Sequence, residues 1–424
     1  MSASAPSRPT NDMGSQSSGS PVRIADKAQS GPRLAVVLSH PTQYYSPWFR
    51  FLAERGGLTL HVFYLWNFGV TTQVDQGFKT SLQWDLPLLE GYDHTFVENQ
   101  SADPGTHHFS GLNNPQLRGE LDQFAPDAVL LFGHGWLTNA RLLLRGAPHA
   151  AALLYRGDSH LLGPQESGLK PLVRRLATRM LLRKVDQFLA VGSANADYFK
   201  RHGARNEQIT RVPHCVDNNR FQQQGSGAAG LQRRTELGIT PEQTVFLFAG
   251  KFEEKKRPLD VIRAFRNIQD ESAVLLMAGA GPEEMSLKAA AEGNARIRFL
   301  PFQNQTAMPG LFAAADVFLL PSFGRQETWG LAVNEAMNCR CAVIVSDHVG
   351  CASDLVVDGE NGRVISAGSQ VQLEGAMRDA LAKPERLAQW QERSFQIIDR
   401  YSYEAAREGL LEALEVTRRR GQSS

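Results

Sequence analysis

Residues 317–345 contain a strand, a glycine-containing loop, a helix and a second strand in direct succession. The apolar runs VFLL, at 317–320, and AVIV, at 342–345, predict buried strands, and Gly330 leads from the loop into a helical run, LAVNEAM. This order places a helix N-terminus at the carboxyl end of a parallel strand, where backbone N–H groups attract anions. The stretch therefore predicts an α/β fold whose helix amides, from Gly330, Leu331 and Ala332, face a diphosphate.

Two glutamates accompany this unit. Glu327 lies in the loop, and Glu335 lies one to two turns into the helix. A carboxylate repels phosphate, so we expect Glu335 to face a neutral hydrogen-bond donor such as a ribose diol, and Glu327 to face a second polyol such as a sugar. The alternative is a surface loop and a helix with solvated glutamates.

Strands and helices alternate along two stretches of the chain, which predicts two doubly wound, Rossmann-like domains with parallel sheets that face a cleft. We expect a disordered tail at 1–31, a first domain at 32–221, a linker at 222–241, a second domain at 242–395 and a C-terminal helix at 396–424 that packs back on the first domain. Ligands of such sheets bind at the carboxyl ends of strands. In the first domain these ends carry His40, Gln43, His134, Arg156 and Asp158.

Composition excludes several classes of function. The net charge of +1 argues against a nucleic-acid-binding surface. The sequence has no apolar run of transmembrane length, and its first residues resemble no secretory signal. Four cysteines without a second metal-ligand pair predict buried, reduced thiols rather than a metal site, and therefore a cytoplasmic protein.

Residues 168–184 combine a narrow apolar helical stripe with six surrounding basic residues. Such a helix either docks on an anionic lipid surface, at the inner face of the membrane, or packs its stripe on its own domain.

The spacing of Glu327 and Glu335, with seven residues between them, resembles the donor-binding signature of retaining glycosyltransferases of family 4. The match extends through Ala336-Met337 to the downstream glycines at 350, 359 and 362, and Gly250-Lys251 followed by Lys256 resembles the basic pair that grips the donor diphosphate in this family. The resemblance covers residues 33–419 and implies the two-domain fold called GT-B.

The resemblance also implies roles for individual residues. Glu335 should bind the ribose, Glu327 the transferred sugar, and Pro301-Phe302 the base. The chain departs from the family at Lys251, where arginine is frequent, and at His214-Cys215, where Asn-Gly is usual. Lys255 or Arg257 remain alternatives to Lys256. The histidine that many members place near the donor sugar corresponds either to Arg156, with Asp158 and His160 just after it, or to His134.

Family membership further implies transfer with retention of anomeric configuration. The chain contains no Asp-x-Asp sequence, so we expect no catalytic metal and no cofactor, the nucleotide-sugar being a substrate. The predicted function is transfer of a sugar from a UDP- or GDP-sugar to a saccharide or lipid-linked saccharide in cell-surface polysaccharide or glycoconjugate synthesis. The alternatives are a sugar-nucleotide epimerase and a non-catalytic nucleotide-sugar-binding subunit.

Overall fold

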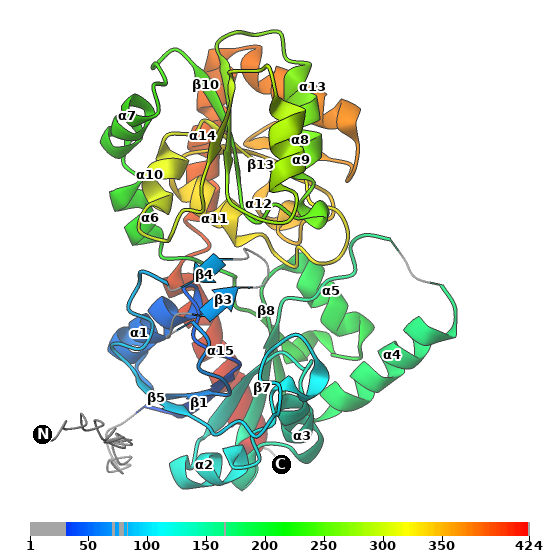
Figure 1. The fold of residues 1–424 in the computed structure, drawn as a ribbon. Helices are drawn as coiled ribbons and strands as arrows, with labels where there is room; N and C mark the ends of the chain where they lie inside the picture. The colour runs from blue at the N-terminus through cyan, green and yellow to red at the C-terminus, as the bar shows by residue number, and fades with distance from the viewer. Residues whose placement is uncertain (1–30, 70–72, 76–79, 83, 165–166, 423–424) are drawn as a thin grey trace, which may run out of the picture.

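Two parallel β-sheets, each covered by helices on both faces, form the two halves of the protein (Figure 1). The structure, a computed structural model, describes residues 31–69, 73–75, 80–82, 84–164 and 167–422. The tail predicted at 1–31 therefore lies almost wholly outside the described residues. The predicted fold, GT-B with two Rossmann-like domains, is confirmed.

The N-terminal sheet has seven strands in the order β5-β2-β1-β6-β7-β8-β9, all parallel. The strands are β1 (Arg33–Leu38), β2 (Thr59–Tyr64), β5 (Asp93–Phe96), β6 (Ala128–Phe132), β7 (Ala152–Gly157), β8 (Gln187–Ala190) and β9 (Ile209–Arg211). The helices are α1 (Tyr45–Arg55), α2 (Leu117–Phe124), α3 (Leu137–Arg145), α4 (Leu169–Leu181) and α5 (Ser193–Arg201), with short 3-10 turns at 109–111, 148–150, 182–184 and 206–208.

The C-terminal sheet has six parallel strands in the order β12-β11-β10-β13-β14-β15. The strands are β10 (Thr244–Ala249), β11 (Ala273–Ala278), β12 (Ile297–Leu300), β13 (Val317–Leu320), β14 (Ala342–Ser346) and β15 (Gly362–Ile365). The helices are α6 (Asn218–Gln224), α7 (Gly227–Glu236), α8 (Pro258–Arg266), α9 (Glu284–Ala291), α10 (Met308–Ala313), α11 (Leu331–Asn338), α12 (Ala352–Leu355), α13 (Gln370–Leu381) and α14 (Pro384–Ile398), with a 3-10 turn at 254–256.

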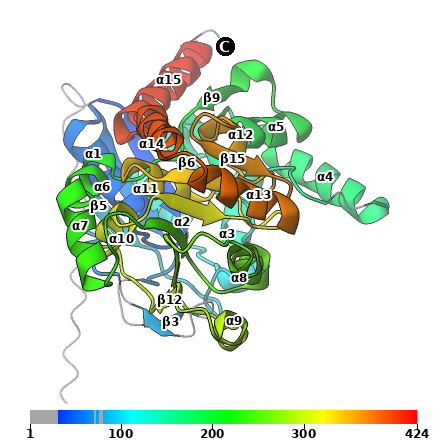
Figure 2. The same cartoon turned by 90° about the horizontal axis from the view of Figure 1, so that it is seen from above.

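The last helix, α15 (Tyr403–Gln422), leaves the C-terminal half and packs on the N-terminal sheet, as the sequence predicts (Figures 1 and 2). Its buried residues Ala406, Leu410, Ala413 and Leu414 share a hydrophobic core with β1, β2 and α1. Gly409 lets the helix approach β9, because a Cβ there would lie 2.1 Å from the carbonyl oxygen of Arg211. The preceding helix, α14, stays on the C-terminal sheet, so the chain crosses between residues 399 and 402.

A buried carboxylate ties the two halves together beside this crossing. Asp354, at α12, accepts hydrogen bonds from the backbone N–H of Ser193, at 2.8 Å, and from its hydroxyl, at 2.9 Å. Arg211 of β9 donates to the same carboxylate, at 3.3 Å. These contacts position α5 of the first half against the second half.

The linker predicted at 222–241 is largely helical, and this expectation requires correction. Helices α6 and α7 occupy most of it, and the Ser226 side chain caps α7 by accepting from the N–H of Ala229. Its glycines are sites of close packing. A Cβ at Gly225 would lie 2.4 Å from Cys339 Sγ, and one at Gly230 would lie 2.3 Å from the carbonyl oxygen of Ala313. These glycines therefore allow close contact with α10 and with the C-terminal end of α11.

The aromatic insertion at 66–92 contains a short antiparallel hairpin, β3 (Gln73–Asp75) and β4 (Thr80–Leu82). After the hairpin, Asp85 accepts hydrogen bonds from the N–H and the hydroxyl of Thr306, which precedes α10 in the other half. Asp85 therefore links the two halves across the cleft.

Candidate active site

A cavity of about 430 Å³ lies between the two halves, at the carboxyl ends of β1, β7, β10, β11 and β13. In each sheet the order of successive strands changes direction beside β1 or β10, and parallel sheets bind ligands at such a switch point. The cavity therefore lies where the strand order predicts a ligand site. Its lining includes most of the predicted residues: Gly250, Lys251, Lys256, Phe302, Glu327, Gly330, Leu331, Ala332 and Glu335 from the second half, with Gln43 and Asp158 from the first.

Glu335 is buried on α11 and faces this cavity. Its side chain is hydrogen-bonded to Gln305, which Arg220 in turn holds through bonds of 2.7 and 2.9 Å. Its other oxygen, Oε1, makes no hydrogen bond to any described residue. Burial raises the pKa of the carboxyl to about 7, against smaller opposing effects of Arg220 and Gln305. A buried acceptor without a partner is costly, and a hydroxyl-bearing ligand would satisfy it.

The N-terminus of α11 opens onto the same cavity. Gly330 is the N-cap, with a φ of 96°, and a Cβ there would lie 3.0 Å from side-chain atoms of Leu320 and Val349. Only glycine adopts this backbone without strain in so narrow a space. The N–H groups of the first turn, among them those of Leu331 and Ala332, have no intrahelical acceptor and suit an anion.

Lys256 and Glu327 form an ion pair in the cavity wall. The ammonium donates to Glu327 Oε2 at 2.6 Å, and the Ser322 hydroxyl donates to the same oxygen at 3.0 Å. Their side chains are 18% and 15% exposed, so water screens the pair only partly. The neighbouring basic residues have other partners, since Lys255 pairs with Glu253 and Arg257 with Asp260. Of these three basic residues, Lys256 is the one that lines the cavity.

The first half supplies a smaller part of the wall. Asp158, just beyond β7, accepts a hydrogen bond of 2.7 Å from the hydroxyl of Thr328 across the cleft. Next to Glu327, His160 donates its Nε2–H to that residue's carbonyl oxygen at 3.2 Å. The loop that follows β7 therefore meets the loop that carries Glu327.

Four other predicted site residues do not line the cavity: Arg156, His134, His40 and Pro301. Arg156 is 2% exposed and donates to the carbonyl oxygens of Val212 and Pro213. Arg156 lies within β7, and the side chains of a strand alternate between the two faces of the sheet. Its guanidinium therefore lies on the face that α1 covers, against the ring of Trp48. Of the alternatives for the family histidine, Arg156 and His134 do not line the cavity, whereas Asp158 does.

The two histidines take part in local packing. His134 Nδ1 lies 2.6 Å from the hydroxyl of Tyr155, and burial lowers the pKa of His134. His40 contacts Ser39, Trp66 and Phe68, and burial lowers its pKa to about 4. Both are neutral near pH 7, as buried histidines commonly are.

Sequence reasoning missed several lining residues: Tyr44, Trp84, His214, Gln303, Gln305, Met308, Thr328 and Trp329. His214 is the most informative. It is buried with a pKa held well below the usual value, by burial first and by the Arg156 charge second. Its ring stacks on Tyr45, and its carbonyl accepts from the Asn334 side chain at 3.0 Å. The chain departs from the family pattern at His214-Cys215, and this departure could have indicated that His214 lines the cavity.

Known proteins resemble the chain along most of its length. Residues 81–220 match the profile of Glycosyltransferase Family 4, and residues 232–396 match that of Glycosyl transferases group 1. A D-inositol 3-phosphate glycosyltransferase of Rhodococcus jostii is 26% identical over 91% of this chain and 89% of its own length. A second protein of that description, from Rhodococcus opacus, is also 26% identical, over 91% of this chain and 90% of its own.

Solved structures share the fold. Anabaena Alr3699/HepE, crystallised in complex with UDP and glucose, superposes with a TM-score of 0.67 at 18% identity, over 91% of this chain and 100% of that one. WaaG, a glycosyltransferase involved in lipopolysaccharide biosynthesis, has a TM-score of 0.61 at 18% identity, over 89% and 99% of the two chains. With two family profiles matched along most of the chain and a cavity between two Rossmann-like halves, the chain belongs to the group 1, family 4 glycosyltransferases.

Proposed function

We propose that this protein is a retaining glycosyltransferase that moves a sugar from a UDP- or GDP-sugar to a saccharide or lipid-linked saccharide acceptor. The observation that carries the proposal is the buried, partly unpartnered Glu335 carboxylate beside the α11 N-terminus and two lysines in one cavity. The Glu335 carboxylate can accept the hydrogen bonds of a ribose, whereas the α11 N-terminus and the two lysines can bind a diphosphate. The HepE complexes with UDP and UDP-glucose support a uridine nucleotide as the first donor to test.

The donor is assigned to the cavity as follows. The base contacts the loop at Phe302, the ribose hydroxyls donate to Glu335, and the diphosphate meets Lys251, Lys256 and the amides at 330–332. The transferred sugar lies against Glu327, which leaves the side of Gln43 and Asp158 for the acceptor.

Catalysis on this assignment is electrostatic. The lysines and the α11 amides stabilise the charge that develops on the departing diphosphate, without a metal ion. Glu327 Oε2 is already held by Lys256 and Ser322. We therefore assign Glu327 to binding the transferred sugar as that sugar passes through an oxocarbenium-like transition state. Attack by the acceptor from the face that the leaving group occupies gives retention of configuration.

Isothermal titration of UDP, GDP and ADP, followed by transfer assays with the sugar nucleotides of the base that binds, tests this function. One nucleotide should bind, and the product should carry the donor's anomeric configuration by NMR. A donor converted without acceptor would favour an epimerase. Tight donor binding without turnover on any acceptor would favour a binding subunit, and failure of all three nucleotides to bind would contradict the donor site.

We also propose that the acceptor lies at the inner face of the membrane and that α4 contacts the lipid. Five apolar residues of α4 are 48% to 77% exposed: Leu169, Leu172, Val173, Leu176 and Met180. This supports docking over packing of the stripe on its own domain. Both views show α4 projecting from the N-terminal half (Figures 1 and 2). Among the described residues, no helix is both long and apolar enough to cross a bilayer.

Replacing Leu172, Leu176 and Met180 together by serine should weaken binding to vesicles that contain anionic lipid by about 100-fold, because three side chains lose their burial in the interface. Vesicle co-sedimentation measures this. Serine at Met285 and Val371, which are 86% and 81% exposed in the other half, is the matched control and should change nothing. Equal binding of wild type and the triple variant would show that α4 is a solvated helix.

A further inference from the structure

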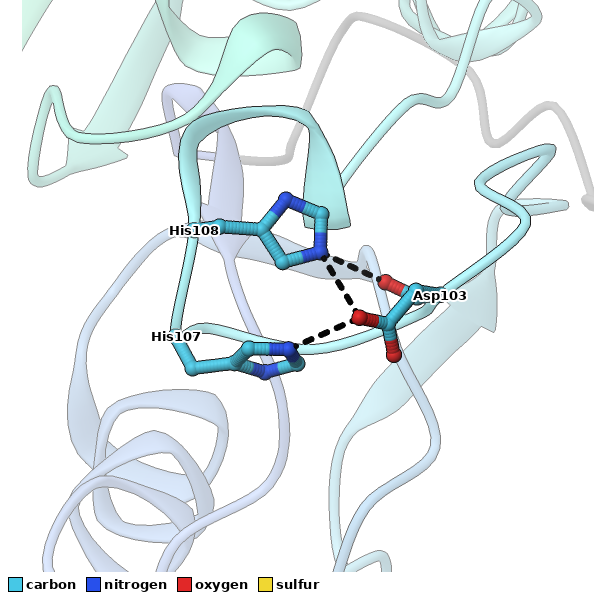
Figure 3. A group of neighbouring side chains, drawn as sticks. All are labelled: Asp103, His107 and His108. Atoms are coloured by element: carbon cyan, nitrogen blue, oxygen red, sulfur yellow. Dashed lines mark hydrogen bonds and ion pairs between the residues drawn. The ribbon is translucent and has the colours of Figure 1, made fainter.

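Asp103, His107 and His108 bring their side chains together in the connection between β5 and α2 (Figure 3). His107 Nε2 lies 3.0 Å from Asp103 Oδ2, and His108 Nε2 lies 3.3 Å from the same oxygen. Ligand atoms around a tetrahedral Zn²⁺ with bonds of about 2.0–2.1 Å are separated by about 3.3 Å. The two separations from Asp103 Oδ2 are thus close to the edge length of such a site, and all three ligand atoms lie within 4.8 Å of one another.

The loop backbone holds the aspartate in place. The N–H of Asp103 bonds to the Ser101 hydroxyl, which donates back to the Asp103 carbonyl oxygen. Asn99 ties both ends of the loop, since its Oδ1 accepts from the N–H groups of Ser101 and Asn113 and its Nδ2 donates to the carbonyl oxygen of Gly111. The loop is therefore ordered by contacts outside the three side chains.

Each histidine also has a feature that orients its ring. His108 Nδ1 lies 3.1 Å from the Ser110 hydroxyl and Nε2 lies 3.0 Å from the Asp103 carbonyl oxygen, so these contacts orient the ring, and a metal ion at Nε2 would replace the second of them. His107 lies against Gly105, where a Cβ would be 2.5 Å from the ring nitrogen Nδ1. Glycine at 105 is thus required for the observed position of the His107 ring.

We propose that Asp103, His107 and His108 bind one divalent transition-metal ion, with Zn²⁺ as the best match. Two imidazoles and one carboxylate form a nitrogen-and-oxygen set that suits zinc, and the exposure of Asp103 and His107 leaves a fourth position for water. The site is separate from the donor cavity, because none of the three residues lines it. Bound metal would brace the loop, whose Thr106 carbonyl accepts from Trp136 Nε1 between β6 and α3.

Competition with a chromophoric chelator measures Zn²⁺ binding to the full, tag-free and metal-stripped chain, and Co²⁺ absorption reports the coordination. The chain suits the measurement because all four cysteines are buried. We expect one equivalent to bind, and His107→Ala and His108→Ala each to weaken binding by at least about tenfold. Gly105→Ala should also weaken it by displacing the His107 ring.

His149→Ala is the matched control. His149 is also an exposed histidine beside an aspartate, with Nε2 at 3.3 Å from Asp122 Oδ1, but among the residues that the structure describes no third ligand joins that pair. Its removal should leave Zn²⁺ affinity unchanged. Absence of Zn²⁺ binding by the wild type, or equal binding by the wild type and the His107 and His108 variants, would overturn the proposal. Thermal unfolding of the metal-free variants at the wild-type temperature excludes misfolding as the cause of a loss.

Discussion

Glu335→Gln should weaken nucleotide binding by at least about 100-fold and at the same time stabilise the ligand-free protein. The binding loss follows because a carboxylate accepts strong, charge-assisted hydrogen bonds from two ribose hydroxyls, each contributing about 1.5–3 kcal/mol. The stability gain follows because burial raises the pKa of this carboxyl from 4.5 to about 7. Titration calorimetry and thermal unfolding measure the two effects separately.

The size of the stability effect depends on pH. Between the unfolded pKa of 4.5 and the folded pKa of about 7, the folded state binds more protons than the unfolded state. The free energy of unfolding therefore falls as pH rises through this range, and at pH 8 the whole loss, about 3 kcal/mol, is present. Glutamine does not ionise and should remove it. At pH 4, below both values, the advantage of the variant should vanish.

Nucleotide affinity should show the complementary dependence on pH. In the wild type it should fall as the pH drops below about 7, because the protonated carboxyl accepts hydrogen bonds poorly. In Glu335→Gln it should be flat. Glu374→Gln, a half-buried helical position paired with Arg378, is the control and should gain no stability. Unchanged nucleotide affinity in Glu335→Gln would refute the ribose assignment.

Lys256→Met and Glu327→Gln should each lower kcat by about 100- to 1,000-fold, the usual cost of removing one group that stabilises transition-state charge. Because the two side chains are bonded at 2.6 Å, their effects should not add. Removing Lys256 leaves Glu327 without its counter-ion, so either change disturbs the same pair, and the double variant should resemble the worse single one. Steady-state kinetics of all three variants measures the coupling.

Nucleotide binding separates the two roles. Glu327→Gln should leave the affinity for the free nucleotide within about twofold, since it faces the transferred sugar, whereas Lys256→Met should weaken it through the diphosphate. Lys255→Met is the matched control, because Lys255 pairs with Glu253. If Lys255→Met lowers kcat as much as Lys256→Met does, the assignment of Lys256 fails.

Local sequence patterns determined the fold class and much of the second half of the cavity. Apolar runs such as 317–320 and 342–345 form central strands because a buried parallel strand needs apolar side chains on both faces. The positions of Gly330 and Glu335 follow from the strand, loop and helix that carry them, all within one continuous stretch. The edge strands β5 and β15, with sequences DHTF and GRVI, lack this signal, and we did not predict them.

Tertiary structure decided which of several chemically equivalent residues reach the cavity. Arg156 donates to the Val212 carbonyl oxygen and does not line the cavity, whereas His214, more distant in the sequence, does. The alternation of side chains along β7 and the docking of the two halves determine these positions. The choice of Lys256 over Lys255 and Arg257 depends on which carboxylate each one meets. The glycines at 225 and 230 suggested a linker, yet they pack against α10 and α11. Sequence specifies periodicity and residue type within a segment, whereas contacts between distant segments depend on packing that no single segment encodes.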